Sequence, residues 1–352
     1  MPISAKNTRN NFDLIRLAAA SQVALGHAIS HLYPHGEWLR VLSYFPGVPV
    51  FFFVSGYLIY GSFNNIENRT RTNRLTIFFT NRVLRLYPAL ILCFFLTLLA
   101  IYLSGYLRTV QFTHLQFATW IATALTFFQF YNPDFLRGYA TGVANGSLWT
   151  ISVELQFYLL TPLIFVLMRR RKKLAVALFV ILLFANLGNT FLNPTVSVGQ
   201  KLVNVSFVPW IYMFLVGAYV STSKPLRDWA LSRKWSHVIV LYLLVYYISE
   251  KFNLGVANAI NPVAFLILAT LLLKMAYSNP DLTYKLLRKN DISYGVYIYH
   301  NPIVNVLIYK HLAGTLLSVF VTMALTPLFA FASWKLVERP ALNLKKIALR
   351  RY

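Results

Sequence analysis

Two ionisable side chains in the first apolar segment of the chain, Arg16 and His27, have types and a spacing that suit chemistry. Their positions differ by 11 residues, which at about 100° per residue falls within roughly 20° of whole helical turns. A guanidinium binds anions, and an imidazole exchanges protons near neutral pH. Asp13 lies on the same predicted face, and the small residues Ala20 and Ala24 lie between the two. A helix here would therefore present a polar stripe with little bulk in its middle.

The residues alone leave a structural and a functional interpretation of this stripe open. In the structural one, Asp13 pairs with Arg16, and His27 bonds to a neighbouring helix. In the functional one, the stripe lines a cavity that holds a substrate. An ionisable group inside a bilayer costs several kcal/mol unless it is paired, and such groups are often functional. For His27 the two interpretations carry equal weight.

The composition places the chain in a membrane. Hydrophobic residues make up 57% of the 352 and charged residues only 12%, whereas a soluble domain carries about a quarter charged residues. The net charge of +23 comes from short basic runs between apolar segments, which is typical of cytoplasmic membrane loops and argues against a nucleic-acid partner. Asp13 and Arg16, with no cleavage site after them, favour a first membrane helix over a signal peptide. Cys93, the single cysteine, has no partner for an internal disulfide.

Hydropathy predicts a series of apolar segments that are candidates for membrane helices. They cover residues 12–33, 45–63, 83–105, 115–131, 147–168, 174–191, 203–221, 237–250, 257–276, 292–312 and 315–337. Segment 115–131 contains Gln116 and Gln129, so we expect it to be re-entrant or to lie in the interface. Without that crossing, the strongly basic loops and both termini fall on the cytoplasmic side. The expected fold is an all-α integral membrane protein with about ten transmembrane helices in a single domain, residues 1–352.

Glu154 is an acidic residue inside the predicted helix 147–168. It lies about seven residues, or roughly 10 Å, from the outer end of that helix, and His27 lies in the outer half of its own helix. We therefore hypothesise that Glu154 meets His27 and either orients the imidazole ring or raises its basicity. In the alternative, Glu154 pairs with Arg137 on the outer face.

At the opposite face, Arg82 and Arg85 open an apolar helix and share one side of it. With Arg16 and Arg74 they form a predicted positive cluster at the cytoplasmic entrance. Such a cluster either signals topology and contacts anionic lipid, or binds a phosphorylated handle. Arg85 lies about one turn into the apolar run, which favours the second role.

Two further motifs carry small or titratable groups. Ser55 and Gly56 interrupt an aromatic run and favour close helix packing. His300, about 12 Å from the inner end of its predicted helix, is either a site residue or a buried hydrogen-bonding partner, with equal weight. The histidines show no metal-ligand spacing, so no metal is expected.

Five motifs follow one another along nearly the whole chain. They are FDLIR (12–16) with the Gly26-His27 pair, FVSGYL (53–58), RVLRLYP (82–88), SLWTISVELQFY (147–158) and SYGVYIYH (293–300). In this order they resemble the acyltransferase-3 family, the membrane-bound acyltransferases that O-acylate bacterial surface polysaccharides. The resemblance implies transfer of an acyl group, usually acetyl from cytoplasmic acetyl-CoA, to a hydroxyl of a surface polysaccharide or a lipid-linked glycan such as O-antigen. It also implies a location in the bacterial inner membrane, in contact with membrane lipid.

The resemblance marks Arg16, His27, Arg82, Arg85 and Glu154 as positions that the family uses. Together with the cytoplasmic cluster, it makes the expected catalytic residues His27, Glu154 and Arg16, and the expected acyl-CoA ligands Arg82, Arg85, Arg16 and Arg74. The expected supporting residues are Asp13, Trp149, Ser152, Tyr297 and His300. Whether His27 acts as a general base or carries the acyl group itself is left open.

The expected site residues also predict the paths of the two substrates. The pantetheine arm of the donor would pass the gap at Ala20 and Ala24, and the connection 106–146 is the expected acceptor-facing surface. The chain resembles a stand-alone member of the family, without the SGNH-type hydrolase domain of many larger members. Its oligomeric state is left open.

A transporter or flippase for an anionic or lipid-linked substrate is the main alternative. In it, the arginine cluster and the intramembrane histidine would be substrate and proton sites. The sequence shows no internal repeat, which counts against an inverted-repeat transporter. A polyprenyl-phosphate sugar transferase needs acidic outer loops, and Asp134 is the sole acid in the connection 106–146.

Overall fold

The structure is a computed structural model that describes residues 9–34, 38–69, 73–191, 197–288 and 290–348. Within these ranges every regular element is a helix, which confirms the expected all-α class. The first half contains α1 (Phe12–Leu32), α2 (Trp38–Ser43), α3 (Gly47–Arg69), α4 (Arg74–Leu103), α5 (His114–Ala124) and α6 (Trp149–Arg170). The second half contains α7 (Lys172–Phe191), α8 (Val198–Asn204), α9 (Ile211–Thr222), α10 (Lys224–Ser232), α11 (Trp235–Lys251), α12 (Pro262–Ser278), α13 (Leu282–Leu287), α14 (Ser293–Tyr309), α15 (Leu316–Ser333), η5 (Trp334–Glu338) and α16 (Arg339–Ala348).

Several helices have the length and composition of membrane spans. In the described part of the chain there are four such stretches, Arg40–Asn68, Arg74–Leu103, Gly146–Arg170 and Leu316–Leu344, which supports a multi-pass membrane protein. α9 and α12 have only 12 and 17 residues, whereas a span needs about 20. The ten crossings therefore stay a prediction, as does the cytoplasmic side of both termini, which lie outside the described residues.

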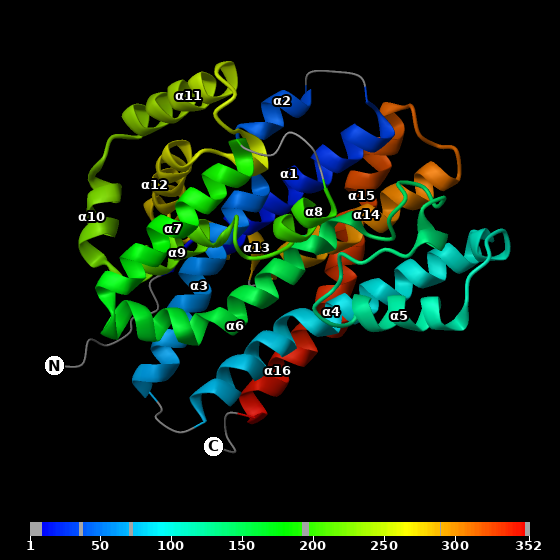
Figure 1. The fold of residues 1–352 in the computed structure, drawn as a ribbon, viewed down its shortest axis with the longest axis horizontal. Coiled ribbons are helices and arrows are strands. Elements are labelled where there is room, and N and C mark those ends of the chain that lie inside the picture. The colour runs from blue at the N-terminus through cyan, green and yellow to red at the C-terminus, as the bar shows by residue number, and fades with distance from the viewer. Residues whose placement is uncertain (1–8, 35–37, 70–72, 192–196, 289, 349–352) are drawn as a thin grey trace.

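α5 covers the first part of segment 115–131. It has 11 residues, or about 16 Å, roughly half the thickness of a bilayer core. A capping box between Thr113 and Gln116 starts it, and Trp120 packs against Phe94 of α4, so that α5 lies beside the end of α4 (Figure 1). The helix is too short to cross, in agreement with the sequence; its location in the interface stays a prediction.

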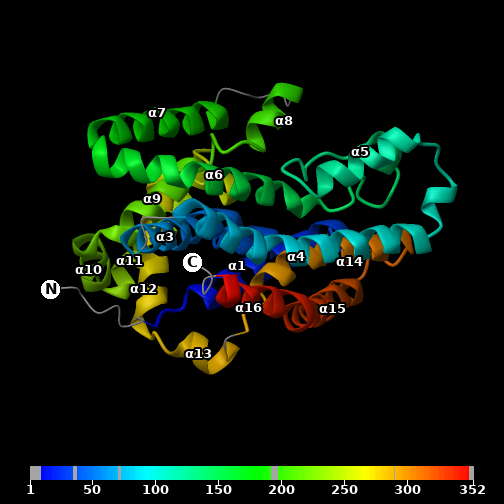
Figure 2. The ribbon, with the colours of Figure 1, turned by 90° about the horizontal axis from the view of Figure 1, so that it is seen from below.

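α1 lies inside the bundle, where it packs against α14, α3 and α15. Figure 2 shows α7 and α15 on opposite sides of the molecule, with α1, α3 and α4 between them. α14 packs in turn against α15 and α4. The polar stripe of α1 is therefore enclosed by protein, and any partner of its side chains comes from these neighbours.

α3 and α9 approach each other closely through two glycines. A Cβ atom at Gly56 would lie 2.0 Å from the carbonyl oxygen of Phe214, and one at Gly217 would lie 2.1 Å from that of Phe53. Both contacts are with backbone, which has no rotamer to change. The packing interpretation of the Ser-Gly pair is therefore confirmed.

We expect Gly56→Ala to destabilise the fold by about 1–3 kcal/mol or more, because the added methyl group overpacks a backbone contact. Gly61→Ala is the matched control, since its Cβ would meet only the Ser221 side chain at 3.9 Å. Thermal unfolding of the two purified variants in detergent measures the difference. Equal midpoints for the two would show that α3 and α9 do not depend on this contact.

Candidate active site

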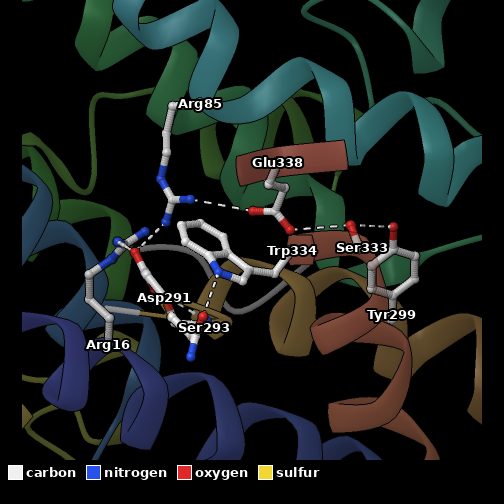
Figure 3. Close-up of polar contacts among 9 residues, drawn as sticks. Arg16, Arg85, Asp291, Ser293, Tyr299, Ser333, Trp334 and Glu338 are labelled. Carbon is white, nitrogen blue, oxygen red and sulfur yellow. Dashed lines mark hydrogen bonds and ion pairs between the residues drawn. The ribbon is translucent and has the colours of Figure 1, made fainter. Parts of the chain in front are cut away.

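Two arginines from different helices converge on one carboxylate (Figure 3). Arg16 of α1 donates from Nη1 to Oδ2 of Asp291 at 2.8 Å. Arg85 of α4 forms an ion pair with the same oxygen and a second one with Oε2 of Glu338 at 3.3 Å. The side chains of the first three are 14–18% exposed, and that of Glu338 is 1% exposed. We call these four residues the arginine–carboxylate cluster.

The start of α14 holds Asp291 in place. Its Oδ1 accepts hydrogen bonds from the backbone N–H of Ser293 at 3.2 Å and from the Ser293 hydroxyl at 2.5 Å. A negative charge at a helix N-terminus is also favoured by the helix dipole. Burial alone would raise the pKa of Asp291, but ion pairs with Arg85 and Arg16 lower it to about 2. The carboxylate is therefore ionised at physiological pH.

Glu338 ends a π-helical turn, η5, that continues α15. π-Turns widen a helix and are frequent at functional sites. Oε1 of Glu338 accepts a hydrogen bond from Ser333 at 3.2 Å, and Ser333 accepts one from Tyr299 of α14 at 3.1 Å (Figure 3). Trp334 of the same turn donates to Asn290 at 3.1 Å. The turn thus ties the cluster to both α14 and α15.

Arg82 differs from the other two arginines because it has no carboxylate partner within the described ranges. Its Nη2 donates to Ser62 at 3.3 Å, and its guanidinium lies over the rings of Phe78 and Tyr158. Its Nε is buried and has no hydrogen-bond partner. A half-buried guanidinium with an unused donor is suited to an anionic ligand.

Arg74 does not join the other arginines. At the start of α4 its guanidinium pairs with Glu67 at 2.6 Å, and its side chain is 46% exposed. Arg74 stands more than two turns from Arg82 along the helix. Its expected part in holding acyl-CoA stays a prediction that this geometry does not support.

Further along α1 and α14, two histidines form a pair. Nδ1 of His27 lies 2.9 Å from Nε2 of His300, and Nδ1 of His300 lies 3.2 Å from the carbonyl oxygen of Val296. His300 is fully buried, and His27 is half-buried. Arg16 and His27 thus both contact the α14 segment, which confirms that they share one face of α1.

The contacts of this pair define its tautomers. A carbonyl oxygen only accepts, so Nδ1 of His300 carries a proton. Neither ring contacts a carboxylate in the described part of the chain, and two adjacent cationic rings would repel each other, so at most one ring is charged. The state that can accept a proton is the one in which both rings are neutral. Nε2 of His300 is then an acceptor, and Nδ1 of His27 donates to it. The lone pair of His27 is therefore on Nε2, where it can accept a proton.

A proline in α14 connects this pair to the start of α6. Pro302 has no N–H, so the carbonyl of Ile298, four residues earlier, loses its helical donor. The side-chain amide of Asn145 donates to that carbonyl at 2.8 Å, and the Cys93 thiol lies 3.3 Å from it. The segment around Asn145 is thereby fixed against α14 within one turn of His300.

The hypothesis that Glu154 meets His27 is wrong in this structure. Glu154 accepts a hydrogen bond from the hydroxyl of Tyr158 at 2.7 Å, one turn further along α6, and interacts electrostatically with Arg16. Its hydrogen-bond partner is therefore Tyr158 and not the imidazole of His27. The alternative partner Arg137 donates instead to the carbonyl of Asn132 at 3.2 Å.

Other expected features of the stripe also differ. Arg16 forms its ion pair with Asp291. Asp13 interacts electrostatically with Arg16 and Asp291 but forms no ion pair with Arg16. Ala20 and Ala24 are fully buried against neighbouring helices. The expected gap for a pantetheine arm at these alanines is therefore closed.

The remaining expected supporting residues lie in the wall around the start of α6. Tyr297 shares a hydrogen bond with Thr150 at 2.7 Å and donates to the carbonyl of Ser147 at 3.1 Å. The hydroxyl of Ser152 donates to Gln129 at 2.6 Å. Trp149 packs against Trp210, with ring centroids 5.4 Å apart.

The sequence reasoning missed Asp291 and Glu338. Each stands at an end of a predicted apolar segment, and Asp291 directly precedes the SYGVYIYH motif. The chain contains only ten acidic residues, so an acid at the end of a membrane helix was a usable signal. Position alone does not separate such an acid from the charged loop that adjoins it.

Comparisons with known proteins identify the family of the chain. The acyltransferase-3 family model, described as an acyltransferase domain, matches residues 9–335. Nodulation protein 10 of Rhizobium leguminosarum bv. viciae is 31% identical over 356 residues, 96% of this chain and 94% of that protein. The O-acetyl transferase of Shigella phage Sf6 is 25% identical over 341 residues, 94% of this chain and 95% of that protein.

A partial match is the O-acetyltransferase OatA of Staphylococcus aureus (strain NCTC 8325 / PS 47), which is 30% identical over 151 residues, 42% of this chain and 24% of that protein. No solved structure matches. The family match covers the histidine pair and all of the arginine–carboxylate cluster except Glu338. The chain therefore belongs to the acyltransferase-3 family and is a membrane acyltransferase.

Proposed function

We propose that this protein is an O-acetyltransferase of the bacterial inner membrane. It takes the acetyl group from acetyl-CoA at the cytoplasmic side and transfers it to a hydroxyl of a surface polysaccharide or a lipid-linked glycan such as O-antigen. The observation that carries this proposal is that α1 contacts Asp291 through Arg16 near its start and His300 through His27 near its end. We call these two places the arginine level and the histidine level. Along α1, Arg16 and His27 are about 16 Å apart, a distance that one long, flexible donor can span, although its arm does not pass over Ala20 and Ala24, which are fully buried.

The arginine level is suited to the phosphates of coenzyme A. Within the described ranges Arg82 has no carboxylate partner, and its Nε donor is unused. Arg85, about one turn later on α4, and Arg16 are both held by Asp291. Bidentate guanidinium donors match phosphate geometry. The hydroxyl of Tyr294 on α14, buried without a hydrogen-bond partner, lies between the two levels in the chain and would donate to the thioester carbonyl oxygen.

At the histidine level, Nε2 of His27 acts as the general base. It accepts the proton of the acceptor hydroxyl while the hydroxyl oxygen attacks the thioester carbonyl carbon. The C–S bond then breaks, and the proton passes from His27 to the departing thiolate. The products are the acetyl ester and free coenzyme A. His300 positions the ring by accepting from Nδ1 of His27.

The direct test of this function is label transfer. Membranes that contain the protein are given radiolabelled acetyl-CoA and the cell's own surface polysaccharide after mild alkali has removed its O-acetyl groups. We expect label in the polysaccharide and release of coenzyme A in equal amounts. A transporter would give neither, and consumption of acetyl-CoA without label in the polysaccharide would exclude this acceptor class.

Arg82→Ala is expected to raise the KM for acetyl-CoA about 10-fold to 100-fold, because a hydrogen-bonded charge pair with phosphate is lost. kcat at saturating donor should change little, since the phosphate contact is made equally in the ground and transition states. Arg170→Ala, which removes an exposed charge at the basic end of α6, is the control for loss of general electrostatic attraction. Equal KM values for the two variants would contradict a specific role for Arg82.

A further inference from the structure

A cavity of about 620 Å³ lies at the start of α6, apart from the arginine–carboxylate cluster. Its walls come from the end of the connection 106–146, from α8, from the start of α9 and from the turn at Asn258. This size is typical of sites that hold a small molecule. Among the described residues of its lining, Lys201 is the only charged one, so this lining suits the diphosphate of coenzyme A less well than the arginines do.

One wall of this cavity is aromatic. Trp149 and Trp210 both line it, with ring centroids 5.4 Å apart. The indole N–H of Trp210 donates to the carbonyl of Asn204 at 2.8 Å, and Phe52 packs against its ring, so that the orientation of this indole is fixed. A rigid aromatic face provides a large contact area for a flat, partly apolar ring.

Another part of the lining is rich in amides. Gln200 and Asn204 are four residues apart on α8 and share one face of it. Asn258 also lines the cavity. An amide side chain has two N–H donors and an oxygen with two lone pairs, so one that already makes a hydrogen bond can still bind a ligand. A pyranose ring has C–H faces that stack on aromatic rings and hydroxyl edges that pair with such groups, so the two parts of the lining together suit a sugar.

Gly146, in the lining of this cavity, lies against α14 beside the histidine pair. A Cβ atom at Gly146 would lie 3.2 Å from the side-chain nitrogen of Asn301, the neighbour of His300 on α14. Asn301 is 3% exposed, and its Oδ1 is buried without a hydrogen-bond partner. An unused acceptor at this depth points to a polar ligand group, because buried polar atoms are nearly always paired.

We propose that this cavity holds the glycan acceptor, with a pyranose ring stacked on Trp149 and Trp210 and a hydroxyl directed past Gly146 toward Asn301 and His27. The amides of α8 bind the outer hydroxyls, and Lys201 faces any acidic group of the same glycan. This assignment rests on the proposed function for the class of its ligand. It gives the two substrates separate entrances, with the donor at the arginines and the acceptor at the tryptophans.

The test compares Trp149→Leu with Trp149→Phe in the purified full chain, with de-O-acetylated surface polysaccharide and acetyl-CoA as substrates. We expect the leucine variant to raise the acceptor KM about threefold to tenfold, with the phenylalanine variant between it and the native protein. The donor KM should be unchanged. Gln200→Ala, on a different element, is expected to raise the acceptor KM without any change at the tryptophans. Trp229→Leu, an exposed tryptophan of α10, is the control.

The outcomes distinguish a failure of the proposed acceptor site from a failure of the proposed function. An acceptor KM that is native in both Trp149→Leu and Gln200→Ala, with transfer intact, would overturn the site and leave the proposed function standing. Fragments of the polysaccharide that quench the native tryptophan fluorescence but receive no acetyl group would support the site and overturn the function. The same quenching should be at least threefold weaker in Trp149→Leu.

Discussion

Replacement of His27 by alanine is expected to reduce acetyl transfer about 10²-fold to 10⁴-fold, the usual contribution of a general base. The acceptor hydroxyl has a pKa far above neutrality, so it is a poor nucleophile until a base takes its proton. His27 has the lone pair on Nε2, is half-buried and is fixed by a 2.9 Å contact with His300. Rates of label transfer from acetyl-CoA, at equal amounts of protein, measure the loss.

His27→Asn separates the chemical role from a structural one. The asparagine amide keeps a donor near the position of Nδ1 and can still bond to Nε2 of His300, but it offers no base at the position of Nε2. We therefore expect a native unfolding midpoint together with the full loss of transfer. His31→Ala is the matched control, since His31 is exposed one turn later on the same helix.

Substantial transfer by His27→Asn would contradict the role of His27 as base. An acyl group carried on His27 would give a different result from direct transfer in the native protein. Incubation with labelled acetyl-CoA alone, followed by denaturation, would then leave label on the protein. Direct transfer predicts none, because the acetyl group stays on coenzyme A until the acceptor binds.

The positions of the helices follow from the sequence for a physical reason. In lipid the backbone must satisfy its own hydrogen bonds, so long apolar runs become helices. The lengths of the helices cannot be predicted from hydropathy in the same way. Segment 203–221 becomes the 12-residue helix α9, which packs on α3 through Gly56 and Gly217. That contact depends on two helices far apart in the chain, and hydropathy carries no information about it.

In the functional site, too, some features can be predicted from the sequence and others cannot. Helical periodicity is enough to place Arg16 and His27 on one face of α1, and the structure confirms it. Their partners, Asp291 and His300, come from a segment more than 270 residues away, so tertiary packing decides them. The failure for Glu154 has a related cause: counting residues along a helix gives depth, but the direction of the carboxylate depends on its bond to Tyr158.

Asp291→Asn is expected to lower the free energy of unfolding by about 3–5 kcal/mol, the usual loss when one partner of a buried ion pair is removed. Asparagine has the same size and can still accept from Ser293, so packing at the start of α14 is kept. It leaves Arg16 without its carboxylate, while Arg85 keeps only Glu338. Thermal unfolding in detergent, with and without acetyl-CoA, measures the loss.

The pH dependence of this difference has a definite sign. The pKa of Asp291 is lowered to about 2 in the folded protein, from about 3.9 in an unfolded chain. A lowered pKa stabilises the fold fully above the unfolded value and loses its effect as the pH falls toward the folded value. Between about pH 5 and pH 8 this carboxylate should therefore contribute a constant amount. A gap between native protein and Asp291→Asn that widens across this range would contradict the assignment.

The control for the arginine–carboxylate cluster is Asp281→Asn. Asp281 pairs with Arg9 at 2.6 Å, but the two side chains are 50% and 62% exposed, and exposed pairs contribute little. A large effect at Asp291 and none at Asp281 would show that the cluster depends on burial and shared geometry. We expect the donor KM of Asp291→Asn to rise as well, because Arg16 and Arg85 are then free to leave the positions at which they flank Arg82. A loss of stability without a change in donor KM would instead make Asp291 a structural residue, and would leave Arg82 alone to bind the phosphates.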